Sequence, residues 1–129
     1  MNTIADKPST SQSFTLPTLA EGEQNAGLIF DENGLPEWLI LLPGEGNNLT
    51  HKQATAWAKK ANGRLPTRQE QSLLFANLKN QFQPTWYWSS EVHESDSDYA
   101  YIQFFSYGSQ TYGSKGIKHR ARAVRRLKI

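Results

Sequence analysis

Two helix-start signals stand close together in the middle of the chain. Thr50 is followed three residues later by Gln53, and Thr67 is followed at the same spacing by Glu70. In such a capping box the threonine hydroxyl and the longer side chain each bind a backbone N–H that the first helical turn leaves unsatisfied. Any fold for this chain therefore has to contain two short helices next to each other in sequence.

The residues behind each capping box continue the helical pattern. Apolar residues recur at helical spacing and predict helices over about residues 50–62 and 66–79. Gly63 stands where a left-handed residue would end the first helix.

Strand patterns flank the two predicted helices. Before them, Leu28–Phe30 and Trp38–Leu42 surround Asn33-Gly34, which predicts a β-hairpin. After Pro84, residues that favour strands predict three more segments, at Trp86–Trp88, Tyr99–Tyr107 and Ile117–Leu127. Strands at both ends and helices between them are typical of the α+β class.

The length of 129 residues fits one domain, and we expect a mobile N-terminal tail over residues 1–13 and a single domain over residues 14–129. The chain has no cysteine, which excludes disulfides, thiolate metal sites and thiol nucleophiles. The longest apolar run, Trp38–Leu42, is too short to cross a membrane, and no signal-peptide pattern opens the chain. We therefore expect a cytoplasmic protein without a membrane partner.

Charge is distributed unevenly along the chain. Residues 1–98 hold all twelve acidic residues and seven of the fourteen basic ones, a net charge of −5, whereas residues 99–129 carry +7. Five basic residues share one face of the predicted last strand: Lys118, Arg120, Arg122, Arg126 and Lys128. This stripe could contact nucleic acid phosphates or an acidic protein surface, or it could pair with acidic residues of the same chain.

Nine of the fifteen aromatic residues lie between Trp86 and Tyr112. Alternation in the strand over 99–107 places five side chains on one face: Tyr99, Tyr101, Gln103, Phe105 and Tyr107. If the opposite face is the core, these residues and Tyr112 form a platform for a protein partner. The alternative is that the helices or the N-terminal arm cover this face. The same strand could also pair with its own copy in a homodimer.

The acidic loop over residues 91–98 is the one place where a metal site can be drawn. Glu91 and His93 would project together if the preceding strand continued, and carboxylate with imidazole suits zinc or manganese. Serine and aspartate at this density are more typical of a solvated turn. We expect no metal, no cofactor and no catalytic residues, because no spacing of nucleophile and base supports an enzyme.

Four separated motifs carry a resemblance to a known family: Gly63-Arg64-Leu65-Pro66-Thr67 with Glu70, Trp86-Tyr87-Trp88-Ser89-Ser90, Tyr99-Ala100-Tyr101-Ile102-Gln103-Phe104 with Gly108, and Ala123-Val124-Arg125-Arg126-Leu127. Over about residues 25–128 the chain resembles the uncharacterised family typified by the C-terminal domain of a bacterial collagen-like adhesin, often met in phage and prophage genomes. That family is similar to the formylglycine-generating sulfatase-modifying domains. The resemblance implies a C-type lectin-like fold, with two helices packed on a mostly antiparallel sheet.

The chain departs from its relatives where they carry chemistry. Formylglycine-generating enzymes need two active-site cysteines, and calcium-dependent lectins use Glu-Pro-Asn or Gln-Pro-Asp with Trp-Asn-Asp; none of these occurs here. The expected function is therefore a non-catalytic binding module, as a phage or prophage accessory protein. Its predicted partner-binding residues are Tyr101, Gln103, Phe105, Tyr107, Tyr112, Arg120 and Arg122. The alternatives are nucleic-acid binding by the basic strand and glycan or metal-dependent binding at the acidic loop.

Overall fold

The computed structural model describes residues 15–129, so the tail predicted over residues 1–13 lies outside the described residues. The described part contains two α-helices, α1 (His51–Lys60) and α2 (Arg68–Leu78), and a short 3-10 helix, η2 (Lys79–Gln81). Its strands are β2 (Gln24–Phe30), β3 (Pro36–Leu41), β4 (Gly46–Leu49), β5 (Trp86–Val92), β6 (Tyr99–Phe104), β7 (Ser109–Ser114), β8 (His119–Ala121) and β9 (Val124–Lys128). In residues 15–129 no helix is long and apolar enough to cross a membrane.

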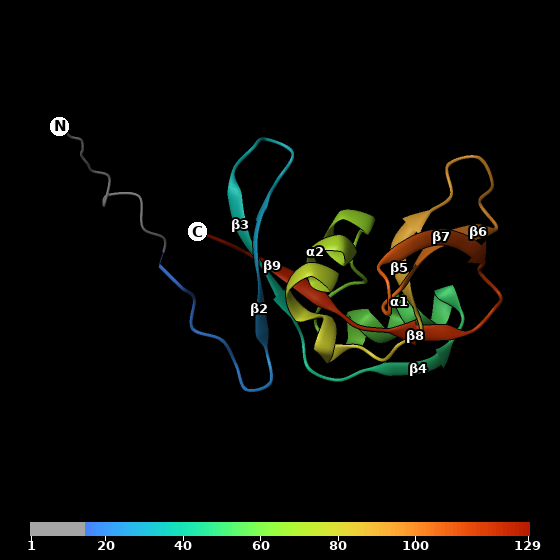
Figure 1. The fold of residues 1–129 in the computed structure, drawn as a ribbon, viewed down its shortest axis with the longest axis horizontal. Helices are drawn as coiled ribbons and strands as arrows, with labels where there is room; N and C mark the ends of the chain where they lie inside the picture. Colours follow the sequence, from blue (N-terminus) through green and yellow to red (C-terminus); the bar gives the residue numbers. More distant parts are fainter. Residues whose placement is uncertain (1–14) are drawn as a thin grey trace.

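The strands form two sheets, which confirms the α+β class. One sheet has the order β2-β3-β9 and joins the first hairpin to the end of the described chain. The other has the order β4-β8-β5-β6-β7, in which β5 and β8 run parallel and the other neighbours are antiparallel. In Figure 1 the two sheets lie side by side; α2 lies between them and contacts strands of both, and α1 lies against the larger sheet.

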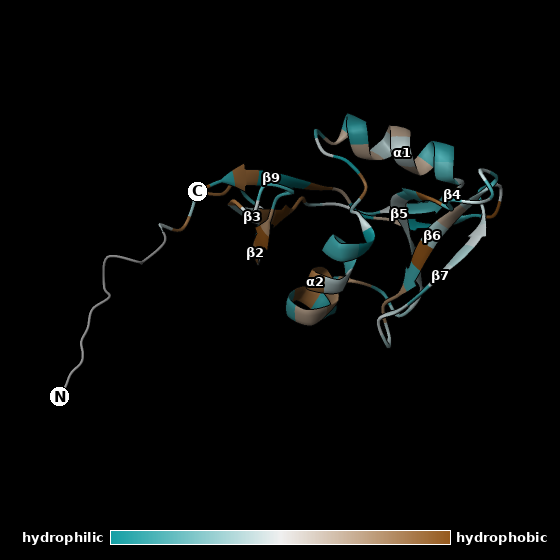
Figure 2. Ribbon diagram, turned by 90° about the horizontal axis from the view of Figure 1, so that it is seen from above, coloured by the Kyte–Doolittle hydropathy of each residue, from teal (hydrophilic) through white to brown (hydrophobic). Residues whose placement is uncertain are grey.

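The two helices lie on opposite sides of the strands (Figure 2). Each covers its own apolar core, because alternating side chains of the strands point to opposite faces. The core beneath α1 includes Ile40, Ala54, Ala58, Trp88 and Ile102. The core beneath α2 includes Leu39, Leu41, Leu74, Tyr87 and Phe105.

Both predicted capping boxes are present, and each threonine hydroxyl accepts a hydrogen bond from the backbone of the residue three positions later. The first helix ends at Lys60, two residues before the predicted end at Asn62, and the left-handed residue after it is Asn62 (φ 67°) and not Gly63. Gly63 is required for a different reason. A Cβ at this position would lie 2.6 Å from the carbonyl oxygen of Val124, where the loop after α1 crosses the chain at the start of β9.

The predicted last strand is two strands that belong to different sheets. The chain leaves the larger sheet after Ala121 and enters the smaller one at Val124. At this crossing the backbone N–H of Leu42 donates to Ala123, and Val124 exchanges two hydrogen bonds with Arg64. The crossing segment is thus bound by loops instead of by one neighbouring strand. Strands β4 and β7 were not predicted, because their residues are mostly polar or glycine.

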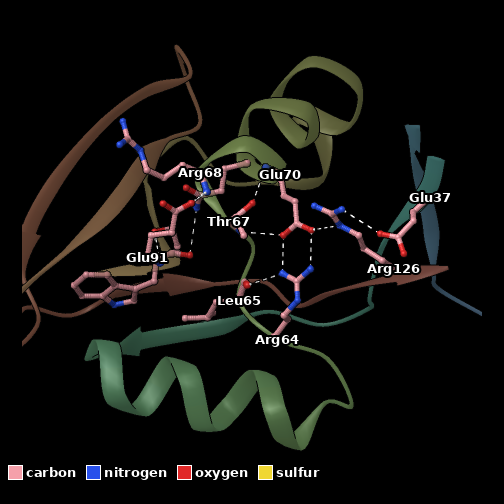
Figure 3. A network of polar contacts seen from close by, with 11 residues as sticks. Glu37, Arg64, Leu65, Thr67, Arg68, Glu70, Glu91 and Arg126 are labelled. Atoms are coloured by element: carbon pink, nitrogen blue, oxygen red, sulfur yellow. Dashed lines mark hydrogen bonds and ion pairs between the residues drawn. The ribbon is translucent and has the colours of Figure 1, made fainter. Parts of the chain in front are cut away.

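A buried carboxylate joins α2 to the smaller sheet (Figure 3). Glu70 has no exposed side-chain surface and accepts two hydrogen bonds from Arg64, at 2.6 and 2.7 Å. It also accepts from the Arg126 Nε at 2.7 Å and from the Thr67 backbone at 2.9 Å. Arg126 in turn donates to Glu37 of β3 at 3.1 Å. Arg64 and Glu70 thus hold the loop before α2 in place, and Glu70 caps the helix.

The hydrogen bonds to Glu70 determine its ionisation. Burial opposes the charged form, but the hydrogen bonds from Arg64, from the Thr67 backbone and from Arg126 outweigh it and lower the pKa to about 2, from an ordinary 4.5. Because the folded pKa is the lower one, ionised Glu70 stabilises the fold fully above pH 4.5. This contribution is lost as the pH falls towards 2.

We predict that Glu70→Gln lowers the free energy of unfolding by about 2 kcal/mol at neutral pH, because a neutral side chain loses the charge-assisted hydrogen bonds from Arg64 and Arg126. The difference between wild type and variant should shrink as the pH falls from 4.5 to 2, where wild-type Glu70 also loses its charge. Urea unfolding at several pH values measures both effects. Glu32→Gln, an exposed position in the β2–β3 turn, is the matched control; a pH-independent difference for Glu70→Gln would contradict the assignment.

Candidate functional site

Helix α2 covers half of the predicted aromatic platform. Gln103 is fully buried, and its Nε2 donates to the carbonyl of Gln71 in α2 at 2.7 Å. Phe105 is 1 % exposed and stacks on Phe82, with ring centroids 3.9 Å apart. Gln103 and Phe105 were therefore wrongly predicted as surface residues. The alternative, in which a helix covers this face, is confirmed for this part of the strand.

On the N-terminal side of α2, the same sheet face carries four packed rings, those of His93, Tyr99, Tyr101 and Tyr112. We call them the aromatic cluster. Tyr112 contacts the other three, with centroid distances of 4.3 Å to His93, 5.9 Å to Tyr99 and 6.0 Å to Tyr101. The planes meet at 62° to 83°, the edge-to-face geometry that aromatic rings favour. The rings come from β6, β7 and the loop after β5 and hold one another in place.

Charged groups fix the inner side of the aromatic cluster. The guanidinium of Arg68, the first residue of α2, lies 3.9 Å from the centroid of the Tyr101 ring. The Arg68 Nε also donates to Gln110 at 3.1 Å, and the Arg68 backbone N–H donates to Glu91 at 2.8 Å (Figure 3). The helix start is thereby bound to strands β5 and β7.

The Tyr101 hydroxyl donates a hydrogen bond of 2.7 Å to Glu94. This hydrogen bond is the main cause of a lowered pKa for the Glu94 carboxyl and of a raised pKa for the Tyr101 phenol. Glu94 thus remains an ionised acceptor and Tyr101 a neutral donor at neutral pH. Tyr101 is 8 % exposed, whereas Tyr112 is 51 % exposed, so the cluster has a fixed base and an accessible top.

The acidic loop next to the cluster is organised by its own backbone. Asp96 accepts from the backbone N–H of Asp98, and the Asp98 carbonyl accepts from Lys115 at 2.9 Å. Glu91 and His93 do not converge on one point: Glu91 binds the start of α2, and His93 packs against Tyr112. Within residues 15–129 no three metal-ligating side chains are grouped so as to hold an ion.

The arginines of the predicted basic stripe are bound within the protein. Arg122 is 9 % exposed and donates to the carbonyls of Gln81 and Leu42, at 2.6 and 2.9 Å. Arg120 donates to Glu45 at 2.8 Å and to Asn47. Arg122 was therefore wrongly predicted as a surface residue, because its side chain turns inward to bind these two carbonyls where the chain crosses between the sheets.

The same holds for β9, where Arg125 pairs with Glu23 at 2.8 Å and Arg126 pairs with Glu37 and Glu70. Internal pairing, one of the alternatives for the charge asymmetry, is thus confirmed for these arginines. The continuous basic face does not exist as predicted, because β8 and β9 are separate strands. The alternative of nucleic-acid binding by this face required exposed, unpaired arginines, and these arginines are paired within the protein.

The structure separates Tyr107 from the other predicted site residues. It is 79 % exposed in the turn between β6 and β7, at the opposite end of that hairpin from the cluster. Of the seven predicted partner-binding residues, Tyr101 and Tyr112 meet in the cluster. Tyr99 was placed on the same face by alternation and also belongs there. Arg68 and Glu94 were missed, although the position of Arg68 at a predicted helix start was a usable signal.

No model of a known protein family matches this chain, and no curated protein sequence matches it.

We predict opposite outcomes for two neighbouring aromatic residues. Phe105→Ala should lower the free energy of unfolding by about 3–5 kcal/mol, because it removes a fully buried ring from the core beneath α2. Tyr107→Ala should change it by less than about 0.5 kcal/mol, because this side chain is exposed. Thermal or urea unfolding of both variants measures the difference. Equal stability of the two would contradict the packing of α2 on this face.

Proposed function

We propose that the protein is a non-catalytic binding module that recognises a protein partner through the aromatic cluster. The observation that carries this proposal is the arrangement of Tyr112, half exposed, on a base of Tyr99, Tyr101 and His93. Tyrosine and arginine are enriched where proteins bind one another, since they combine large apolar area with polar tips. Here the packed rings are already ordered, so little conformational entropy is lost on binding.

The chemistry available at the cluster is also that of binding. Its accessible groups are ring faces, phenol hydroxyls and an imidazole, with the acidic loop at its border. A protein surface can meet such groups by packing and hydrogen bonding over a broad area, with no reaction required. A protein partner is favoured over nucleic acid because most arginines near the C-terminal strands are already paired with glutamates.

The proposal includes the C-type lectin-like fold implied by the resemblance. In its support, strands from the start and the end of the described chain share one sheet, and both helices precede the strands β5 to β7 of the other. A phage or prophage origin and a location in the host cell cytoplasm belong to the same proposal. The absence of cysteine is compatible with a reducing compartment.

Affinity capture with the tagged full chain tests the proposal. Wild-type protein, the double variant His93→Ala/Tyr112→Ala and the control Tyr107→Ala are each incubated with nuclease-treated lysate of the native host. We expect one stoichiometric protein to be retained by wild type and by Tyr107→Ala, and lost with the double variant. The control removes an exposed tyrosine outside the cluster and so separates specific recognition from general aromatic stickiness.

Two results would contradict the proposal. One is retention of the same protein by the double variant, provided that circular dichroism shows an intact fold. The other is that a parallel, untreated lysate yields bound material and the nuclease-treated lysate yields none, and that the amount of bound material falls steeply as salt is added. That result would favour contact with nucleic acid phosphates instead.

A further inference from the structure

The strands that end the two sheets differ in how their free edges are protected. An end strand offers unpaired backbone N–H and C=O groups to any other strand, and proteins usually block it with charges, prolines, bulges or covering side chains. The ends of the smaller sheet are β2 and β9. Strand β9 carries Arg125, Arg126 and Lys128 and is therefore blocked by charge.

Strand β2 is blocked in two ways. Its register shifts between Asn25 and Gly27, where Gly27 has a φ of 118°. Its Ala26 carbonyl accepts a hydrogen bond of 2.6 Å from Asn77 of α2. Strand β4, at one end of the larger sheet, is only four residues long; its register also shifts, and Asn48 has a left-handed φ of 59°.

Strand β7, at the other end of the larger sheet, has none of these protections. It pairs with β6 in unbroken register over all six residues, from Ser109 to Ser114. The whole hairpin from Tyr99 to Ser114 contains no charged residue and no proline. Within residues 15–129 no strand pairs with the outer side of β7, which forms the rim of the sheet in Figure 2.

The geometry points to β7 as a dimerisation edge, which pairs antiparallel with β7 of a second copy of this chain and joins the two larger sheets into one. A second copy fits because an uncharged strand meets its own copy without repulsion. In an antiparallel pair, residues that lie directly opposite each other point to the same sheet face. A symmetric pair of β7 strands therefore has one residue opposite its own copy at the twofold axis, and in the middle of the strand this residue is Thr111 or Tyr112.

The charges at the two ends of β7 favour the antiparallel direction. The acidic loop lies beside the Ser114 end, where the backbone N–H of Lys115 donates to the backbone carbonyl of Asp98, and the uncharged turn over residues 105–108 lies at the Ser109 end. Antiparallel pairing places each acidic loop next to the uncharged turn of the other copy. Parallel pairing would bring the two acidic loops together, which costs free energy through repulsion between like charges.

Charge-swap variants of Thr111 test the dimer. This side chain is exposed and lies on the sheet face opposite to Tyr112, so its substitution leaves the aromatic cluster intact. By sedimentation equilibrium, wild type should show a mass that rises to twice the monomer mass with concentration. Thr111→Lys and Thr111→Glu should each remain monomeric, and an equimolar mixture of the two should dimerise.

Ala56→Lys and Ala56→Glu, on the exposed face of α1, are the matched controls and should dimerise like wild type. Hydrogen exchange adds a reading of the strand itself, because half of the β7 amides should exchange more slowly in wild type than in Thr111→Lys. A wild-type monomer at every concentration would overturn the proposal and leave the edge to an extended peptide of another protein. So would a Thr111→Lys variant that stays dimeric, since the dimer would then use another surface.

Discussion

The ion pairs around Glu70 determine how the parts of this protein are arranged. One buried carboxylate ends the loop before α2, caps that helix, and binds an arginine from the loop and another from β9. Both arginine side chains reach this carboxylate only when the loop, the helix and the smaller sheet are in the positions that the structure shows. A carboxylate without exposed surface is stable only when its partners neutralise it. The orientation of α2 relative to the smaller sheet therefore depends on this charge.

That orientation decides which part of the aromatic sheet face remains accessible. Helix α2 begins at Arg68, directly after the capping threonine, and covers Gln103 and Phe105 from there towards η2. On the N-terminal side of α2 the sheet face carries the aromatic cluster, where Tyr101 is buried under the Arg68 guanidinium and Tyr112 is half exposed. Arg68 contacts both regions, since its backbone belongs to the helix and its guanidinium lies over Tyr101. The candidate site is thus the part of the sheet face that the helix does not reach.

The sequence predicted local structure well and long-range packing only in part. The capping boxes and the Asn33-Gly34 hairpin depend on neighbouring residues, and both were found. The polar strand β7 carries no strand signal of its own and forms because β6 provides a partner. Aromatic residues occupy both faces of β6, so alternation alone gave no means to choose the covered face. Arg122 shows the same limit, because the two carbonyls to which its guanidinium donates, those of Leu42 and Gln81, lie far away in sequence.

The contact between β3 and β9 has a consequence for how the chain folds. Leu42 follows β3 directly, and Arg122 lies just before β9. A hydrogen bond joins these two residues, which are eighty positions apart in sequence. Closing so long a loop is entropically costly, and a high contact order slows folding. We expect the hairpin β2–β3 and the pair β6–β7 to form early from local contacts, and the pairing of β9 with β3 and of Arg126 with Glu70 to come last. Until then Glu70 is paired with Arg64 and not with Arg126, so we expect the docking of β9 to limit the folding rate.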